Sequence, residues 1–180
     1  MPQYAAFLRA VNVGKRVVKM EALRTAFVKM GFSNVQTIIA SGNVVFDTPQ
    51  KRVSRIEQAI ESGLQDALGF DVTTFVRTGP ELIDLARHPL VAGQSLKNGE
   101  SVFVAFLRDT PAPETTRKLT ALEAEGERVI VHRHHVLWLV PGRFSDSALS
   151  GPVLERTLGV PATLRNATTV RRMLDKFRAD

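Results

Sequence analysis

The chain has 180 residues, no cysteine and a formal net charge of +6. That length suits one domain or two small ones. Without cysteine, disulfides, zinc–thiolate sites, iron–sulfur clusters and thiol catalysis are excluded. The N-terminus shows no long apolar run after a basic start, and no segment reaches the ~18 apolar residues of a membrane span. We therefore expect a cytoplasmic protein without a membrane partner.

The basic excess is spread evenly along the chain. Residues 1–90 hold 11 Lys and Arg against 8 Asp and Glu, and residues 91–180 hold 13 against 10, so each half carries +3. Such a charge favours anionic partners weakly. It lacks the dense basic stripe of a dedicated nucleic-acid-binding protein.

In the first half, short apolar runs indicate strands, and apolar side chains at helical spacing indicate helices. Together they predict the order strand, helix, strand, strand, helix, strand, helix. The expected strands are Gln3–Arg9, Val35–Ala40, Val44–Phe46 and Phe70–Arg77. The expected helices are Met20–Met30 (ended by Gly31), a helix that Thr48 and Pro49 begin and that continues to Leu68, and a short helix after Thr78-Gly79-Pro80-Glu81. The last tetrapeptide has the spacing of a capping box.

The second half repeats this order after a linker predicted at residues 91–100, where glycines interrupt any periodicity. The expected strands are Ser101–Leu107, Arg128–His132, Val136–Val140 and Ala162–Arg165, and the expected helices are Pro113–Glu125, Ser147–Leu158 and Thr168–Ala179. The predicted modules are thus residues 1–90 and 101–180.

Both halves predict an α+β fold of two tandem ferredoxin-like (βαββαβ) modules, each followed by an extra helix. The segments Phe103–Leu107 and Val136–Val140 are apolar at every position. A half-exposed antiparallel strand should alternate, so we expect both faces of these strands to be covered. The other module, the extra helices or a second chain could cover them, and the protein is expected to be a monomer or a homodimer.

The segment after the first strand is the first candidate binding loop. It contains Arg9, Asn12, Gly14 and Lys15, and Lys19 directly precedes the first helix. Such a loop can direct backbone N–H groups and an ammonium toward an anion. It is neither a P-loop nor a dinucleotide fingerprint, and a turn that needs one glycine, with its basic side chains in water, would also explain it.

The second candidate loop is Ser41-Gly42-Asn43, whose residues are also typical of a tight hairpin. In the split βαβ order the first and third strands are neighbours, so this hairpin should lie near the end of the first strand. We therefore expect the two loops to meet at one edge of the sheet.

The third candidate site consists of Arg165 and Asn166 beside the N-terminus of the last helix. A helix N-terminus and an arginine both favour anions. Capping of that helix by Asn166 or Thr168 is the simpler interpretation.

Other chemistries find little support. His132 and His134 share one predicted strand face and His88 is distant in sequence, so we expect no metal site. Ser147 lacks the Gly-x-Ser-x-Gly context, and no pair of carboxylates can be brought together, so acid–base residues stay unassigned. The segment Gly42–Phe46 is a faint match to RNA-recognition strands but lacks their basic residue and paired aromatics.

At these loops the sequence resembles the bacterial domain-of-unknown-function family 1697. The matching stretches are Leu8–Gly14, Val18–Met20, Ser41–Phe46 and, more weakly, Thr163–Val170. The resemblance implies a duplicated ferredoxin-like fold and no established activity. The chain departs from it at Ala148, where members often have Lys, and at Ala167, where they often have an aromatic residue.

Our leading hypothesis is a protein that binds a phosphorylated or otherwise anionic ligand, such as a nucleotide or nucleic acid. We expect no cofactor. The predicted contacts are Arg9, Asn12, Gly14, Lys15, Lys19, Ser41, Gly42 and Asn43, with Arg165 and Asn166 as a second cluster. The alternatives are an enzyme for a small phosphorylated substrate between the modules and an oligomeric scaffold.

Overall fold

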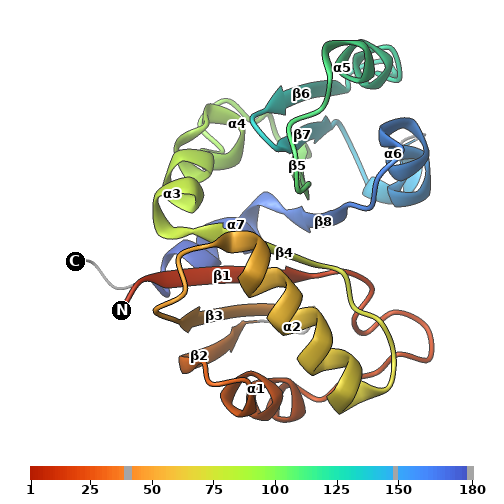
Figure 1. Ribbon diagram of the computed structural model, residues 1–180. Coiled ribbons are helices and arrows are strands. Elements are labelled where there is room, and N and C mark those ends of the chain that lie inside the picture. Colours follow the sequence, from red (N-terminus) through yellow and green to blue (C-terminus); the bar gives the residue numbers. More distant parts are fainter. Residues whose placement is uncertain (39–41, 148–149, 178–180) are drawn as a thin grey trace. The chain divides into compact units, whose positions relative to one another are not determined.

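The computed structural model describes residues 1–38, 42–147 and 150–177 (Figure 1). The chain forms two compact units, Met1–Ile83 with Arg172–Asp180, and Asp84–Arg171. The segment 91–100, predicted as a linker, therefore lies within the second unit. No helix in the described part of the chain is both long and apolar enough to cross a membrane.

The first unit contains a four-stranded sheet in the order β2-β3-β1-β4. Its strands are β1 (Gln3–Leu8), β2 (Ser33–Ile38), β3 (Asn43–Asp47) and β4 (Thr74–Thr78). Each neighbouring pair is antiparallel. This is the order of a split βαβ module, which confirms the prediction that the first and third strands lie side by side.

Helices α1 (Met20–Lys29) and α2 (Val53–Leu68) pack on one face of this sheet (Figure 1). The core between them holds Phe27 of α1, Ile60 of α2 and Phe46 of β3, all with 0% exposure. Because alternate strand residues face opposite sides, this face is the one that Tyr4, Ala6 and Leu8 of β1 share.

Helix α2 begins at Val53, so the prediction that Thr48 and Pro49 start it is wrong. Thr48 uses its hydroxyl to accept a hydrogen bond from the Gln50 backbone N–H, at 3.3 Å. The Gln50 side chain in turn accepts from the N–H of Arg52, at 3.0 Å. These side-chain turns hold residues 48–52 outside the helix, because they give the backbone an alternative to helical bonding.

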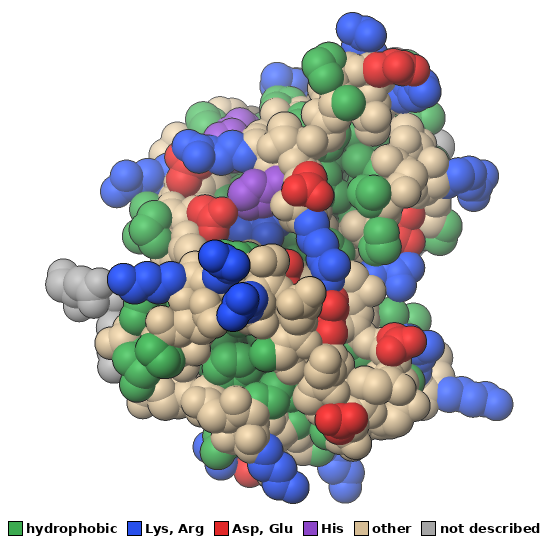
Figure 2. Space-filling model, in the orientation of Figure 1, with side chains coloured by type: hydrophobic (Ala, Val, Ile, Leu, Met, Phe, Trp, Pro, Cys, Tyr) green, Lys and Arg blue, Asp and Glu red, His purple; other side chains and the backbone are tan. Residues whose placement is uncertain are grey.

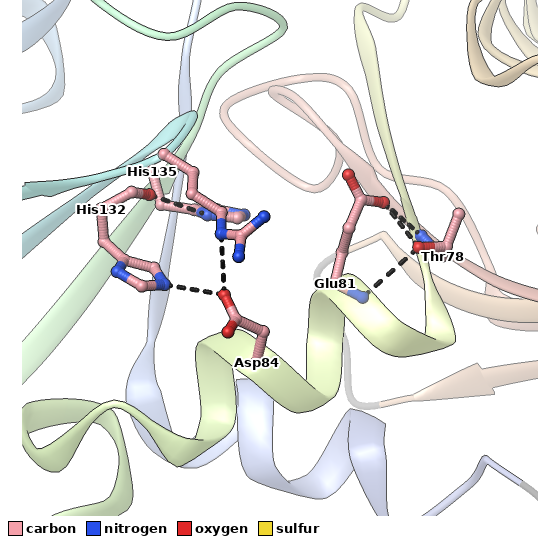
Figure 3. Close-up of polar contacts among 6 residues, drawn as sticks. Thr78, Glu81, Asp84, His132 and His135 are labelled. Atoms are coloured by element: carbon pink, nitrogen blue, oxygen red, sulfur yellow. Dashed lines mark hydrogen bonds and ion pairs between the residues drawn. The ribbon is translucent and has the colours of Figure 1, made fainter.

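The predicted capping box is present at the start of α3 (Gly79–Arg87). The Thr78 hydroxyl accepts from the Glu81 N–H at 3.3 Å, and the Glu81 carboxylate accepts from the Thr78 N–H at 2.8 Å (Figure 3). Each side chain thereby satisfies a backbone donor of the other residue. A further short helix that the sequence did not indicate, α4 (Pro89–Ala92), follows directly.

The second unit repeats the first sheet order, as β6-β7-β5-β8. Its strands are β5 (Ser101–Phe106), β6 (Arg128–His132), β7 (His135–Val140) and β8 (Thr163–Asn166), all paired antiparallel. Its other elements are α5 (Pro113–Thr120), the 3-10 turn η1 (Phe144–Asp146), α6 (Gly151–Leu158) and the start of α7 (Ala167–Leu174), which continues into the first unit after Arg171. The two sheets confirm the predicted pair of ferredoxin-like modules.

One face of the second sheet carries the unit's main core. Trp138 at its centre is fully buried and packs among Leu119 of α5 and Leu154 of α6. Helix α6 begins at Gly151 rather than Ser147, because the Ser150 hydroxyl accepts from the Val153 N–H and caps it there.

The opposite face of the second sheet is buried as well, as the uniformly apolar strands predict. Val104 and Phe106 of β5 and Leu137 of β7 have 0% exposure yet lie outside the Trp138 cluster. Within the unit, α4 lies against β5 and β7. Continuous apolar sequence therefore corresponds to burial on both faces.

Candidate functional site

The loop between β1 and α1 (residues 9–19, called the β1–α1 loop below) meets Gly42, as the sequence predicts. The Leu8 N–H donates to the Gly42 carbonyl at 2.8 Å, one step beyond the strand pair Phe7 and Asn43. A Cβ atom on Gly42 would lie 2.9 Å from Leu8 Cβ and 3.2 Å from Val11 Cβ. The backbones thus approach so closely that only glycine fits without displacement.

The β1–α1 loop has an unusual backbone. Ala10, Asn12 and Gly14 all have positive φ, at 56°, 60° and 59°. Asn12 stabilises the loop, since its side-chain oxygen accepts from the Val18 N–H at 2.7 Å and its own N–H donates to the Arg16 carbonyl at 2.8 Å. Asn12 therefore serves the loop's structure, in an αL position that asparagine tolerates.

The charges of the β1–α1 loop all have one sign. Arg9, Lys15, Arg16 and Lys19 are its only charged residues. Lys15, Arg16 and Lys19 are exposed, while Arg9 is partly buried. The Arg16 guanidinium carbon lies 4.9 Å from the centre of the Phe70 ring, a cation–π contact that orients this side chain.

The tip of the loop also presents backbone donors. In the described ranges no acceptor receives a hydrogen bond from the N–H of Gly14 or Lys15. Both residues are exposed. Neighbouring N–H groups beside αL residues can form a concave donor surface for an anion. Val13 and Val17, 63% and 77% exposed, add apolar surface beside them.

The second predicted loop contributes less. Ser41 lies outside the described residues. Asn43 is 1% exposed, and its side-chain amide donates to the Ile38 carbonyl at 3.2 Å across the hairpin. Its observed contact is therefore with the hairpin itself.

The predicted cluster of Arg165 and Asn166 lies in the second unit. Arg165 is 8% exposed, and its Nη1 donates to Thr163 Oγ1 and to the Leu164 carbonyl, both at 2.8 Å. Burial lowers the pKa of Arg165 to about 10. Asn166 Oδ1 accepts from the Thr168 N–H at 2.8 Å and so caps α7, the simpler of its two interpretations.

A histidine cluster that the sequence analysis did not foresee surrounds the β6–β7 turn (Figure 3). His132 Nε2 lies 2.9 Å from Asp84 Oδ2 on α3, and Arg133 Nε lies 3.0 Å from the same oxygen. The hydrogen bond from His132, followed by the charge of Arg133, lowers the pKa of Asp84 although partial burial opposes this. Asp84 therefore stays ionised as an acceptor for both side chains.

His88 stands beside this pair. Its ring centre lies 5.2 Å from that of His132, and its Nδ1 accepts from the Leu90 N–H at 3.3 Å to cap α4. Burial and then the charges of His132 and Arg128 lower the pKa of His88, while Asp84 acts in the opposite direction. His88 is thus held as a neutral acceptor.

The other two of the chain's four histidines complete the cluster. His134 lies in the β6–β7 turn, beyond the end of β6, so it does not share a strand face with His132, and its ring lies 4.7 Å from that of His135. His135 is 1% exposed, and its Nδ1 lies 3.3 Å from the His132 carbonyl oxygen. Figure 2 shows histidine side chains at the surface of this unit beside basic and acidic ones. Among the residues that the structure describes, no three His, Asp or Glu side chains form a set suited to a metal ion.

Comparison with known proteins identifies the family. The profile of the family described as "Protein of unknown function (DUF1697)" matches residues 1–137. The chain belongs to the DUF1697 family. A search of the curated proteins finds no match.

Among solved structures, this DUF1697 chain is similar to the conserved bacterial protein SP0830 from Streptococcus pneumoniae. The likeness covers 97% of each chain with a TM-score of 0.76 and 22% sequence identity. At that identity the likeness shows the fold alone, and it agrees with the two ferredoxin-like modules.

One signal for the histidine cluster was present in the sequence of this DUF1697 chain. His132, His134 and His135 stand within four positions of one hairpin, with Arg133 between them. Asp84, the partner of His132, is 48 positions away on a helix outside the βαββαβ order. Strand order alone could not place that helix, so the contact was missed.

Proposed function

We propose that the DUF1697 chain binds a phosphorylated ligand through the β1–α1 loop. The observation that carries the proposal is the pair of Gly14 and Lys15 N–H groups, which donate to no acceptor among the described residues, at the tip of a loop whose charges are all positive. Phosphate oxygens accept hydrogen bonds from such amides and pair with ammonium groups.

The loop is also ordered before any ligand arrives. Asn12 closes it from within, and the Leu8–Gly42 hydrogen bond joins the strand end directly before it to the hairpin. Because these contacts already fix the backbone, binding would cost less conformational entropy than ordering a free loop. The exposed Val13 and Val17 offer apolar surface next to the cations, which favours a nucleotide over inorganic phosphate.

Binding of a fluorescent ATP analogue tests the proposal. We expect the double variant Lys15→Ala/Lys19→Ala to weaken binding at least about 10-fold, since two charge-assisted contacts of about 1 kcal/mol each are lost. The melting temperature should stay almost unchanged, because both side chains are exposed.

The matched control removes two other lysines of the same unit, Lys29→Ala/Lys51→Ala, which are also exposed. It changes net charge equally but leaves the β1–α1 loop intact. Equal weakening by both double variants would indicate a general charge effect and contradict the proposal. Loss of folding in the loop variant would show that the loop is structural.

A further inference from the structure

The Asp84–His132 pair has the arrangement of an oriented base. Asp84 Oδ2 is an acceptor only, so the 2.9 Å contact places a proton on His132 Nε2. In the neutral imidazole the other nitrogen, Nδ1, then carries the lone pair. The carboxylate thereby fixes both the tautomer and the ring orientation, as Figure 3 shows for the ring of His132 beside Asp84.

The lone-pair nitrogen is available to a small molecule. His132 Nδ1 has no hydrogen-bond partner among the described residues, and the side chain is 26% exposed. His88, the neighbouring titratable ring, is kept neutral by burial and by its cap on α4. A neutral neighbour does not repel a proton that His132 takes up.

The surroundings of His132 favour a negatively charged substrate. Arg133 uses Nε for Asp84, and its side chain is 63% exposed, so its remaining N–H groups face solvent. Arg87 and Arg128 are further cations whose charges act on Asp84 and His88 respectively. A guanidinium binds carboxylate or phosphate oxygens in a fixed geometry.

We propose that His132 is a general base for the hydrolysis of a small ester that carries a carboxylate or phosphate group, with Arg133 binding that group. Asp84 is the positioning residue. This site lies in the second unit and is independent of ligand binding by the β1–α1 loop.

The step balances without a cofactor. A water molecule attacks the ester carbonyl carbon while His132 Nδ1 accepts a proton from that water. The imidazolium keeps its Nε2 proton, which it donates in a hydrogen bond to Asp84. The carbon–oxygen bond to the alcohol then breaks, and the imidazolium returns the proton to the leaving oxygen. A positioned base of this kind contributes about 10²-fold or more to the rate.

Two chromogenic esters test the proposal: 4-nitrophenyl acetate, which is neutral, and mono-4-nitrophenyl succinate, which carries a carboxylate. For the full chain and for free imidazole we compare one quantity, the rate on the succinate divided by the rate on the acetate. We expect this ratio to be at least about 10-fold larger for the full chain, a factor that one charge-assisted contact can supply. His132→Gln should lower kcat/KM for the succinate about 100-fold. His134→Gln, the control in the same turn, should leave it unchanged.

Asp84→Asn and Arg133→Gln separate the roles. Asp84→Asn should lower kcat/KM for the succinate, because the amide no longer fixes the tautomer of His132, whereas Asp84→Glu, which keeps a carboxylate acceptor, should retain more of the activity. A merely structural role would make both variants equally slow. Arg133→Gln should raise KM for the succinate more than KM for the acetate.

Three results would overturn the proposal: hydrolysis no faster than that by free imidazole, equal activity in the His132→Gln chain, or no preference for the anionic ester. Circular dichroism of each variant checks folding. If His132→Gln is unfolded, the comparison of Asp84→Asn with Asp84→Glu and the ester preference of Arg133→Gln decide the question.

Discussion

Arg77 and Arg165 occupy corresponding positions in the two sheets. Arg77 of β4 pairs with Ala5 of β1, and Arg165 of β8 pairs with Val104 of β5. Each Nη1 donates to the carbonyl of the preceding residue at 2.8 Å. Burial lowers the pKa of each guanidinium to about 10, so both remain charged at neutral pH. The duplicated fold thus repeats a buried charge as well as a strand order.

Arg77→Ala and Arg165→Ala should each lower the free energy of unfolding by about 2–5 kcal/mol, the range for truncating a large buried side chain. Each change removes the buried aliphatic part of an arginine side chain. It also leaves the carbonyl of the preceding residue without its guanidinium donor. Urea denaturation followed by circular dichroism measures the loss. A decrease below about 0.5 kcal/mol, the size of a surface effect, would contradict a packing role.

Gly42→Ala should destabilise the chain more than Gly14→Ala. Both glycines have positive φ, at 68° and 59°, so both variants bear the cost of an αL side chain. Only at Gly42 would the new Cβ meet another atom, Leu8 Cβ at 2.9 Å, whereas Gly14 has nothing within 4 Å. We expect a difference of about 1–3 kcal/mol in unfolding free energy, the usual cost of overpacking. Equal losses would show that the close approach to Leu8 is not tight.

Thr78→Ala should lower the free energy of unfolding by about 1 kcal/mol, because the N–H of Glu81 loses the hydroxyl that caps α3. Thr78→Ser keeps an oxygen at the same position and should retain most of the stability. Thermal unfolding of the two variants makes the comparison. A serine variant as unstable as the alanine variant would point to the lost methyl group rather than to the cap.

His88→Asn should flatten the pH dependence of stability between about pH 7 and 5. The folded state lowers the pKa of His88 below its ordinary value of 6.5, so in this window the unfolded chain binds more protons. Stability therefore falls as pH falls. Asparagine does not titrate but can still accept from the Leu90 N–H as a cap. Urea midpoints across this range, for both proteins, give the comparison, and an unchanged slope would contradict the role of His88.

The sequence was informative where local pattern and strand order suffice. The split βαβ order placed Gly42 beside the end of β1, and the Leu8–Gly42 hydrogen bond confirms it. The capping box at Thr78 was likewise visible, because it depends on residues three apart.

Contacts that depend on tertiary placement were missed. Asp84 meets His132 because α3 and the β6–β7 turn come together, and no local spacing encodes that approach. Thr48 has a side chain suited to an N-cap, yet its hydroxyl closes a turn instead, and α2 starts at Val53. A capping residue type therefore indicates a helix start only when no competing turn is available.

An NMR titration of the isotope-labelled full chain with ATP tests the central proposal most directly, because it observes the backbone donors themselves. We predict saturable shifts in the amide resonances of Gly14 and Lys15, moving downfield as hydrogen bonds to phosphate form, with smaller shifts at Gly42. Absence of shifts at Gly14 and Lys15, or larger shifts confined to other parts of the chain, would contradict ligand binding by the β1–α1 loop.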